Sequence, residues 1–156
     1  MTYDALRRGR ISQHGRCYSV TTVAYHRTPW FLDLACARAA IRELRGTTHL
    51  FGAGTLAWVL MPDHLHWLLS IEGDAKLTDV LRRFKSRSAR AVNGVLRRTG
   101  PIWQRAYYDH ALRREEDLRF AARYLIGNPL RAGLVTEAGG YPHWDAVWVT
   151  SQGPEV

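Results

Sequence analysis

Two apolar segments joined by a two-residue turn constrain the fold of this 156-residue chain more than any other feature. Residues 55–61 and 64–71 are rich in aliphatic, aromatic and β-branched side chains, which favour β-strands. Only Pro62 and Asp63 separate the two segments, and both residue types are common in tight turns. The pattern therefore predicts an antiparallel hairpin.

Strands and helices alternate around this hairpin. The expected elements are a strand over 16–25, a helix capped by Asp33 and closed by Gly46, a long helix over 76–98, a strand over 102–112, and a helix over 115–127 that ends at Asn128-Pro129. Strand, helix, two strands, helix and strand is the βαββαβ order of a ferredoxin-like α+β domain, here with an additional C-terminal helix. Two helices cover one face of the sheet in such a domain. The other face is free for a site or for the third helix.

The length of the chain fits a single domain over residues 1–156 with a real hydrophobic core. A hydrophobic content of 46% and a charged content of 23% argue against a disordered or fibrous chain. We expect the core over about residues 15–135 and a C-terminal tail over 136–156. Tyr141, Trp144 and Trp148 are expected to pack this tail onto the domain, although exposed aromatic side chains could also stack on bases.

The charge balance favours a polyanionic partner. Lys and Arg total 22 against 14 Asp and Glu, a net charge of +8, and only Lys76 and Lys85 are lysines. The planar guanidinium of arginine can donate two hydrogen bonds to one phosphate, which points to nucleic acid, with an ordinary basic surface as the alternative. The helix over 76–98 is the best candidate for contacts with a phosphate backbone because Asp79 is its only acidic residue. Its candidate DNA-binding residues are Arg82, Arg83, Lys85, Arg87 and Arg90.

Other classes of protein receive no support from the sequence. Cys17 and Cys36 form no CxxC pair and no zinc-ligand cluster. The N-terminus lacks the apolar core of a signal peptide, and no apolar run approaches the roughly 20 residues of a membrane span. We therefore expect a soluble, reduced, cytoplasmic protein with no membrane partner.

A pair of histidines lies on the second strand of the predicted hairpin. His64 and His66 are two residues apart, so their side chains point to the same face, about 7 Å apart along the strand. Small rotations would let both imidazoles converge on one metal ion, while Leu65 and Trp67 point to the opposite, buried face. The alternative is two ordinary histidines on a solvated strand face.

The last predicted helix offers a nucleophile beside a metal ligand. Tyr124 and Asn128 are four residues apart, so they share one helix face. A phenolic oxygen is a competent nucleophile when a nearby cation or base assists it, and an amide oxygen is a hard ligand suited to Mg²⁺ or Mn²⁺. Alternatively, Tyr124 is a half-buried aromatic residue and Asn128 belongs to a helix stop. Tyr107 and Tyr108 are rival nucleophiles of lower rank.

Three stretches together resemble one family. Residues 59–69, which read VLMPDHLHWLL, look like the signature of the REP-associated tyrosine transposases, which belong to the single-tyrosine HUH transposases of the insertion-sequence 200-like type. Residues 102–113 and 124–135 agree with this family in order and spacing, and the resemblance covers roughly residues 15–145. His110 lies in the middle stretch, where we expect a structural or substrate-facing role rather than a metal ligand.

The resemblance implies a complete reaction. It implies an HUH domain in which His64 and His66 bind Mg²⁺ or Mn²⁺ and Tyr124 is the nucleophile. Asn128 occupies the position at which true transposases place a polar third ligand, commonly glutamine. The implied substrates are single-stranded DNA hairpins, the repetitive extragenic palindromes (REPs) with a flanking tetranucleotide, which are cut and rejoined through a 5′-phosphotyrosine bond. The implied protein is bacterial and nucleoid-associated, as a monomer or homodimer.

Two other functions remain open from the residues alone. One is a DNA-hairpin-binding regulator without turnover, and the other is a metal-dependent nuclease that uses water in place of tyrosine. A covalent protein–DNA adduct would separate the transposase from both.

Overall fold

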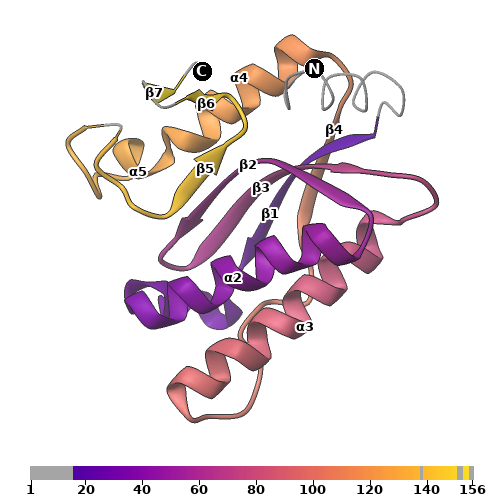
Figure 1. Ribbon diagram of the computed structural model, residues 1–156. Coiled ribbons are helices and arrows are strands. Elements are labelled where there is room, and N and C mark those ends of the chain that lie inside the picture. The colour runs from indigo at the N-terminus through magenta and orange to yellow at the C-terminus, as the bar shows by residue number, and fades with distance from the viewer. Residues whose placement is uncertain (1–15, 138, 151–152, 155–156) are drawn as a thin grey trace.

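The computed structural model describes residues 16–137, 139–150 and 153–154. Its centre is a five-stranded antiparallel sheet with the strand order β4-β1-β3-β2-β5 (Figure 1). The strands of this sheet are β1 (Cys17–Val23), β2 (Ala53–Met61), β3 (His64–Ile71), β4 (Tyr108–Leu112) and β5 (Trp144–Ala146). The helices are α2 (Leu34–Leu50), α3 (Leu77–Leu96), α4 (Glu115–Ile126) and α5 (Asn128–Arg131), with 3-10 turns η1 (Tyr25–Arg27) and η2 (Trp30–Leu32). Strands β6 (Val149–Thr150) and β7 (Gly153–Pro154) form a separate small hairpin.

The expected α+β fold is confirmed. Strands and long helices follow one another as β1, α2, β2, β3, α3 and β4, which is the βαββαβ order, and α4 is the additional helix. The predicted hairpin is β2 and β3, which pair from Met61 with His64 to Ala53 with Ile71. The order β4-β1-β3-β2 with antiparallel pairing throughout is compatible with a ferredoxin-like topology.

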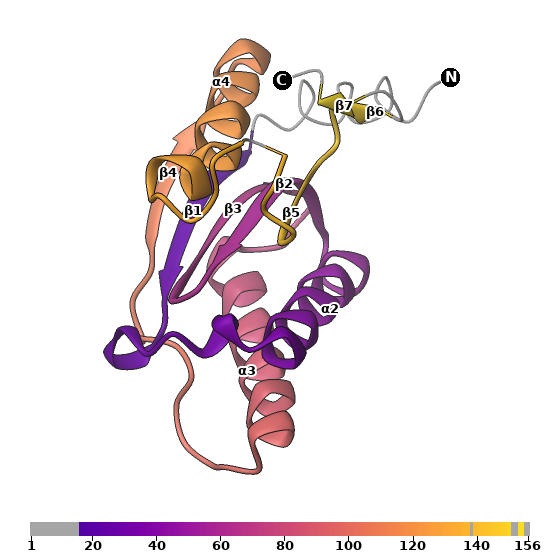
Figure 2. The same ribbon diagram turned by 90° about the vertical axis from the view of Figure 1, so that its left-hand side faces the viewer.

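Two hydrophobic layers lie on opposite faces of the sheet. Helices α2 and α3 cover one face, and α4 lies over the other (Figures 1 and 2). Residues of β3 alternate between these layers, because successive side chains of a strand point to opposite faces. Leu65 and Trp67 enter the core under α2 and α3, as predicted, and Leu68 enters the core under α4. His64 and His66 therefore face the α4 side.

The helix α2 is longer than predicted. Gly46 lies inside the helix and does not close it. The chain leaves α2 at Gly52, which follows the C-cap residue Phe51 and has a φ of 70°. A glycine can end a helix only where the backbone needs this left-handed conformation, and Gly46 has an ordinary helical backbone.

Two predicted strands are shorter than expected. β1 ends at Val23, and Tyr25 already belongs to η1. β4 begins only at Tyr108, whereas residues 102–107 form an irregular segment with one isolated bridge, between Ala24 and Trp103. Ile102 and Trp103 are buried in the core under α2 and α3. This packing and two backbone hydrogen bonds, from Tyr25 N to the Ile102 carbonyl and from Gln104 N to the Val23 carbonyl, hold the start of that segment.

The chain beyond α4 stays close to the sheet. The helix ends before Asn128-Pro129, as predicted, but Asn128 opens the short helix α5 with Pro129 in its first turn, where a missing N–H costs nothing. The tail then adds β5 to the sheet beside β2. Trp148 is only 4% exposed, and the Tyr141 hydroxyl donates to the Leu60 carbonyl at 2.5 Å, so the predicted packing of these tail residues is confirmed. The single-domain boundary over residues 1–156 stays a prediction.

Across the described ranges, no helix has the length and apolar character that a bilayer crossing requires.

Candidate active site

Strand β3 brings the two predicted histidines together. The Nε2 atoms of His64 and His66 lie 3.1 Å apart, and their rings are perpendicular. Two nitrogens bound to one ion at about 2.0–2.1 Å are separated by about this distance when they are neighbours in its coordination shell. The pair is thus already arranged as two adjacent ligands.

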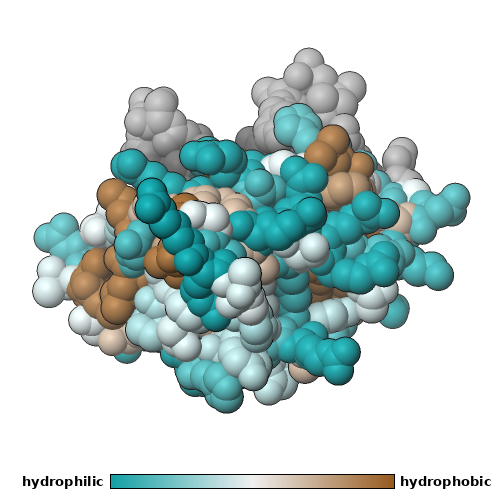
Figure 3. Space-filling view, turned by 90° about the horizontal axis from the view of Figure 1, so that it is seen from below, coloured by the Kyte–Doolittle hydropathy of each residue, from teal (hydrophilic) through white to brown (hydrophobic). Residues whose placement is uncertain are grey.

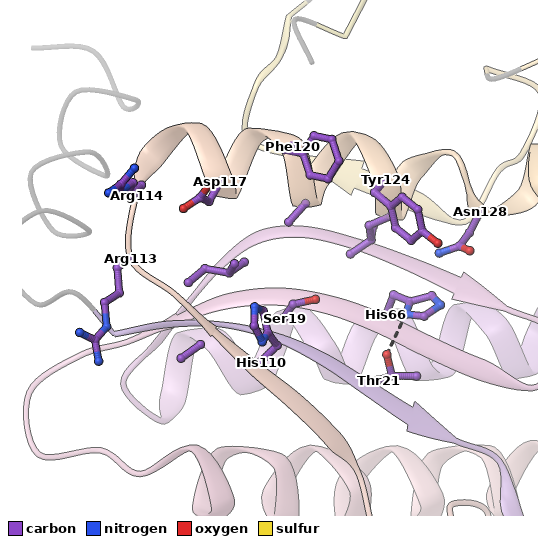
Figure 4. A pocket seen from close by; sticks show the side chains of 14 residues that line it. Ser19, Thr21, His66, His110, Arg113, Arg114, Asp117, Phe120, Tyr124 and Asn128 are labelled. Carbon is purple, nitrogen blue, oxygen red and sulfur yellow. Dashed lines mark hydrogen bonds between the residues drawn. The ribbon is translucent and has the colours of Figure 1, made fainter.

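The other ring nitrogen of each histidine faces an oxygen atom. His64 Nδ1 lies 2.7 Å from the Asp63 carboxylate, and His66 Nδ1 lies 2.9 Å from the Thr21 hydroxyl (Figure 4 draws the second contact). A ligating histidine usually donates its second N–H to such an oxygen, which fixes the tautomer and the ring orientation. Both Nε2 lone pairs are then free to bind a metal ion. Sequence reasoning missed Asp63 and Thr21 as supports of the pair.

Burial keeps His66 in the form that binds metal. Desolvation, with smaller contributions from the positive charges of His64 and Arg131, lowers the pKa of His66 to about 4. The imidazole is therefore neutral at physiological pH, and a neutral imidazole is the ligand that metal ions require.

Tyr124 and Asn128 face the same cavity as His66. The cavity has a volume of about 710 Å³ and lies between α4 and the sheet face formed by β1 and β4. Figure 4 shows the Tyr124 ring and the Asn128 amide extending from the helical segment toward the sheet, on the side of His66. Tyr124 is 60% exposed, so its hydroxyl is accessible to a substrate.

Few side chains besides His64 and His66 are available at the site to bind a metal ion. In the part of the chain that the structure describes, no three His, Cys, Asp or Glu side chains gather in a group that could hold an ion. An ion on His64 and His66 would therefore need other oxygen ligands. The amide oxygen of Asn128 is one candidate because this residue lines the cavity with His66.

The rival tyrosines lie elsewhere. Tyr107 packs against the core under α2 and α3, on the opposite side of the sheet from α4, and Tyr108 is 70% exposed outside the cavity. His110 does line the cavity, in agreement with a substrate-facing role. Tyr124 is the one tyrosine among the described residues that line this cavity.

Arg131 is a further charged group at the site that sequence reasoning missed. Its Cζ lies 3.9 Å from the centroid of the Tyr124 ring, and its Nη2 donates to the Tyr124 carbonyl. Gly127 leaves room for this side chain, since a Cβ there would lie 2.7 Å from Arg131 Nη1. The sequence did contain a signal for this contact: Arg131 follows Tyr124 by seven residues, and residues two helical turns apart lie on one face.

The basic helix α3 does not line this cavity. It lies across the sheet from α4 (Figure 1), on a face whose surface is largely hydrophilic (Figure 3). A separate hollow of about 310 Å³ on this side is lined by Phe51, Arg82, Arg83, Ser86, Arg87 and Arg90. The four predicted arginines of α3 therefore share one surface, which we call the α3 basic face, and this surface is separate from the tyrosine.

The fifth predicted residue of this set, Lys85, has a different environment. Its ammonium group donates to the carbonyl oxygens of Gln104, Arg105 and Ala106 at 2.8, 3.1 and 3.1 Å. All three of its N–H groups can be used within the chain, and burial lowers its pKa to about 8. Lys85 therefore anchors the segment before β4, whereas the four arginines line the surface hollow.

Two proteins share sequence similarity with the chain. A REP-associated tyrosine transposase of Escherichia coli K12 is 31% identical over 87 residues, which are 55% of this chain and 50% of that protein. The chain thus matches only half the length of this relative. A putative REP-associated tyrosine transposase of Haemophilus influenzae is 26% identical over 141 residues, which are 83% of this chain and 78% of the relative.

Solved structures that share the fold include two transposases. A REP-associated tyrosine transposase bound to a REP hairpin superposes with a TM-score of 0.71 at 22% identity, over 84% of this chain and 76% of that one. A putative transposase from Deinococcus radiodurans gives a TM-score of 0.55 at 21% identity, over 69% of this chain and 86% of that one.

A family model described as "Transposase IS200 like" matches residues 14–125. This range includes the histidine pair on β3 and Tyr124 on α4. The match extends over most of the chain and over both elements that form the candidate site. The chain therefore belongs to the family of IS200-like transposases.

Proposed function

We propose that this chain is a metal-dependent tyrosine transposase that cuts and rejoins single-stranded DNA at hairpin repeats. The observation that carries the proposal is the shared cavity, which places Tyr124, Asn128 and His66 together, with His64 Nε2 only 3.1 Å from His66 Nε2. Membership of the IS200-like transposases supports the same reaction class. A regulator that only binds DNA needs neither the paired imidazoles nor an exposed tyrosine beside them.

The residues of the site fit a divalent metal ion such as Mg²⁺ or Mn²⁺. His64 and His66 would hold it, Asn128 is the proposed third ligand, and Asp63 and Thr21 orient the two imidazoles. When bound, such an ion polarises the scissile phosphate and offsets negative charge in the transition state.

Tyr124 is the proposed nucleophile. Its phenolic oxygen attacks phosphorus in line with the bond to the 3′ oxygen, and the phenolic proton is released. The bond from phosphorus to the 3′ oxygen breaks, this oxygen takes up a proton as a 3′-hydroxyl, and a 5′-phosphotyrosine remains. That bond conserves the energy of the phosphodiester, so another 3′-hydroxyl can attack it and rejoin the strand. Arg131, stacked on the Tyr124 ring, keeps the nucleophile oriented.

The proposed substrate is a REP-type DNA hairpin with a single-stranded flank. The names of the Escherichia coli and Haemophilus influenzae relatives and the REP hairpin in one structural neighbour support this choice. The arginines of the α3 basic face would contact phosphates remote from the cut, because the sheet separates them from Tyr124. A chromosomal DNA substrate would place the protein at the bacterial nucleoid, and a monomer and a homodimer both remain compatible with the proposal.

A denaturing gel of labelled hairpins incubated with Mn²⁺ tests the proposal. We expect wild-type protein to form a covalent adduct, and Tyr124→Phe to lose the adduct while it still binds the hairpin. The matched control is Tyr108→Phe, which changes an exposed tyrosine outside the cavity and should keep the adduct. If the wild-type protein cleaves the hairpin without forming an adduct, and Tyr124→Phe still cleaves it, the enzyme is a nuclease that uses water. Binding without cleavage by wild-type protein would indicate the regulator.

A further inference from the structure

Helix α4 has two faces with different roles. Leu118, Ala122, Leu125 and Ile126 are buried against the sheet and form part of its core. The other face carries Asp117, Phe120, Ala121 and Tyr124, which line the cavity of about 710 Å³. Phe120 is 69% exposed, one turn before the proposed nucleophile, and so makes little contribution to the core. Its ring is therefore available to contact a ligand that enters the cavity.

The opposite wall of the cavity carries polar side chains beside Ala111 and Leu112 of β4. Ser19 and Thr21 of β1 and His110 of β4 line it, and Ser19 pairs with His110 across the two strands. Because α4 packs over β2 and β3, this part of the sheet face is left open beside the helix. The cavity is therefore a groove with an aromatic helical wall and a hydrogen-bonding sheet wall, which we call the α4–β4 groove.

Charge is unevenly distributed along the α4–β4 groove. Figure 4 shows Arg113 and Arg114 at the end far from Tyr124, with Phe120 between them and the nucleophile. Asp117 is the one acidic residue among the described side chains that line the groove. Arg114 forms a long ion pair with Glu116 at 3.8 Å, so a carboxylate already competes weakly for its guanidinium. Arg113 is therefore the stronger candidate for an anion.

We propose that the α4–β4 groove holds the single-stranded segment that flanks the scissile phosphate, with one base stacked on Phe120 and a backbone phosphate at Arg113. The inference rests on the proposed function and names where its substrate lies. The groove is continuous with Tyr124 and His66, so a strand positioned for attack can continue along it. Phe120 and Tyr124 are four residues apart, about 6 Å along the helix axis, so the stacked base belongs to a nucleotide near the cut.

The chemistry of the groove suits a single strand better than a duplex. A duplex hides the faces of its bases, whereas an unpaired base can stack on an exposed phenyl ring. Such stacking contributes about 1–3 kcal/mol per base and tolerates any base, because every base has a π-face. Phe120 should therefore fix the position of the strand rather than read its sequence.

The test compares one hairpin with and without its single-stranded flank, in the absence of metal. We expect Phe120→Ala to weaken binding of the flanked hairpin by roughly 5- to 150-fold and to leave the blunt hairpin unaffected. Phe120→Trp should restore the affinity. The matched control is Leu50→Ala, which truncates another exposed apolar residue, at the end of α2 across the sheet, and should change neither affinity.

Two further readouts locate the strand. With 2-aminopurine substituted at successive flank positions, we expect one position to be quenched by wild-type protein and not by Phe120→Ala. Arg113→Gln should lower the slope of log affinity against log salt by about 0.7 for the flanked hairpin, the value for one single-strand phosphate.

The outcomes separate this inference from the proposed function. If wild-type protein forms the covalent adduct but Phe120→Ala binds both hairpins as tightly as wild type, the placement of the strand is wrong. The same holds if Phe120→Ala weakens both hairpins equally, since the residue would then act through the fold. If the flanked hairpin loses affinity as expected but no adduct forms, the groove stands and the tyrosine reaction fails.

Discussion

Asp63→Ala tests whether the histidine pair is a metal site. Asp63 Oδ1 lies 2.7 Å from His64 Nδ1, and its other oxygen lies 3.4 Å from Arg27 Nη1. Burial alone would raise the pKa of Asp63, but the hydrogen bond to His64 and the charges of His64 and Arg27 lower it below its ordinary value. The group is therefore a carboxylate at neutral pH, and its removal leaves the His64 ring without the acceptor that orients it.

The expected loss follows from this contact. Removal of a carboxylate that orients a ligating histidine typically costs 10- to 100-fold in metal affinity. That range corresponds to about 1.4–2.7 kcal/mol, close to the roughly 1.5–3 kcal/mol expected for a hydrogen bond to a charged group. Because Asp63 does not line the cavity that holds Tyr124, saturating metal should restore the rate.

The assay is adduct formation titrated with Mn²⁺, with calorimetric Mn²⁺ binding to the DNA-free protein beside it. Asp63→Ala should shift both midpoints 10- to 100-fold to higher metal concentration, with a similar plateau. Arg27→Ala is the matched control: it removes the exposed ion pair but keeps the contact to His64, so its shift should stay below about fivefold. An unchanged Mn²⁺ midpoint in Asp63→Ala, or a lost plateau with unchanged metal affinity, would refute this reasoning.

Three more predictions concern other contacts. The pKa of His66 is about 4 in the folded protein, below its ordinary value of 6.5. Between these two pH values the metal-free folded protein binds fewer protons than the unfolded chain, so its stability falls as the pH is lowered from 6.5 to about 4. In urea titrations, His66→Gln should reduce this dependence of stability on pH. Lys85→Met should reduce the free energy of unfolding by about 1–3 kcal/mol, because three carbonyls lose their donor, without changing the salt dependence of DNA binding. Arg131→Ala should slow adduct formation about 2- to 5-fold, because it removes a cation–π contact of about 0.5–1 kcal/mol with Tyr124, and Gly127→Ala should do the same by displacing Arg131. If the double variant is slowed by the product of the two single factors, the two substitutions do not act through this one contact.

The sequence by itself determined the order of the elements and the faces of their side chains. Strand and helix periodicities are local, so the hairpin of β2 and β3 and the common direction of His64 and His66 followed from spacing alone. The four-residue spacing likewise placed Tyr124 and Asn128 together, and both line one cavity. These features depend only on residues close together in the chain.

Tertiary structure decided what spacing cannot express. Local composition could not tell that Gly52 rather than Gly46 ends α2, or that β4 begins only at Tyr108 while Ile102 and Trp103 are buried in the core. Both features depend on contacts with distant segments. The support of His66 by Thr21 depends on the pairing of β1 with β3, 45 residues apart. The side of the sheet on which each helix packs is equally a long-range property. For that reason only the fold could show that the arginines of α3 and Tyr124 of α4 lie on opposite faces of the sheet.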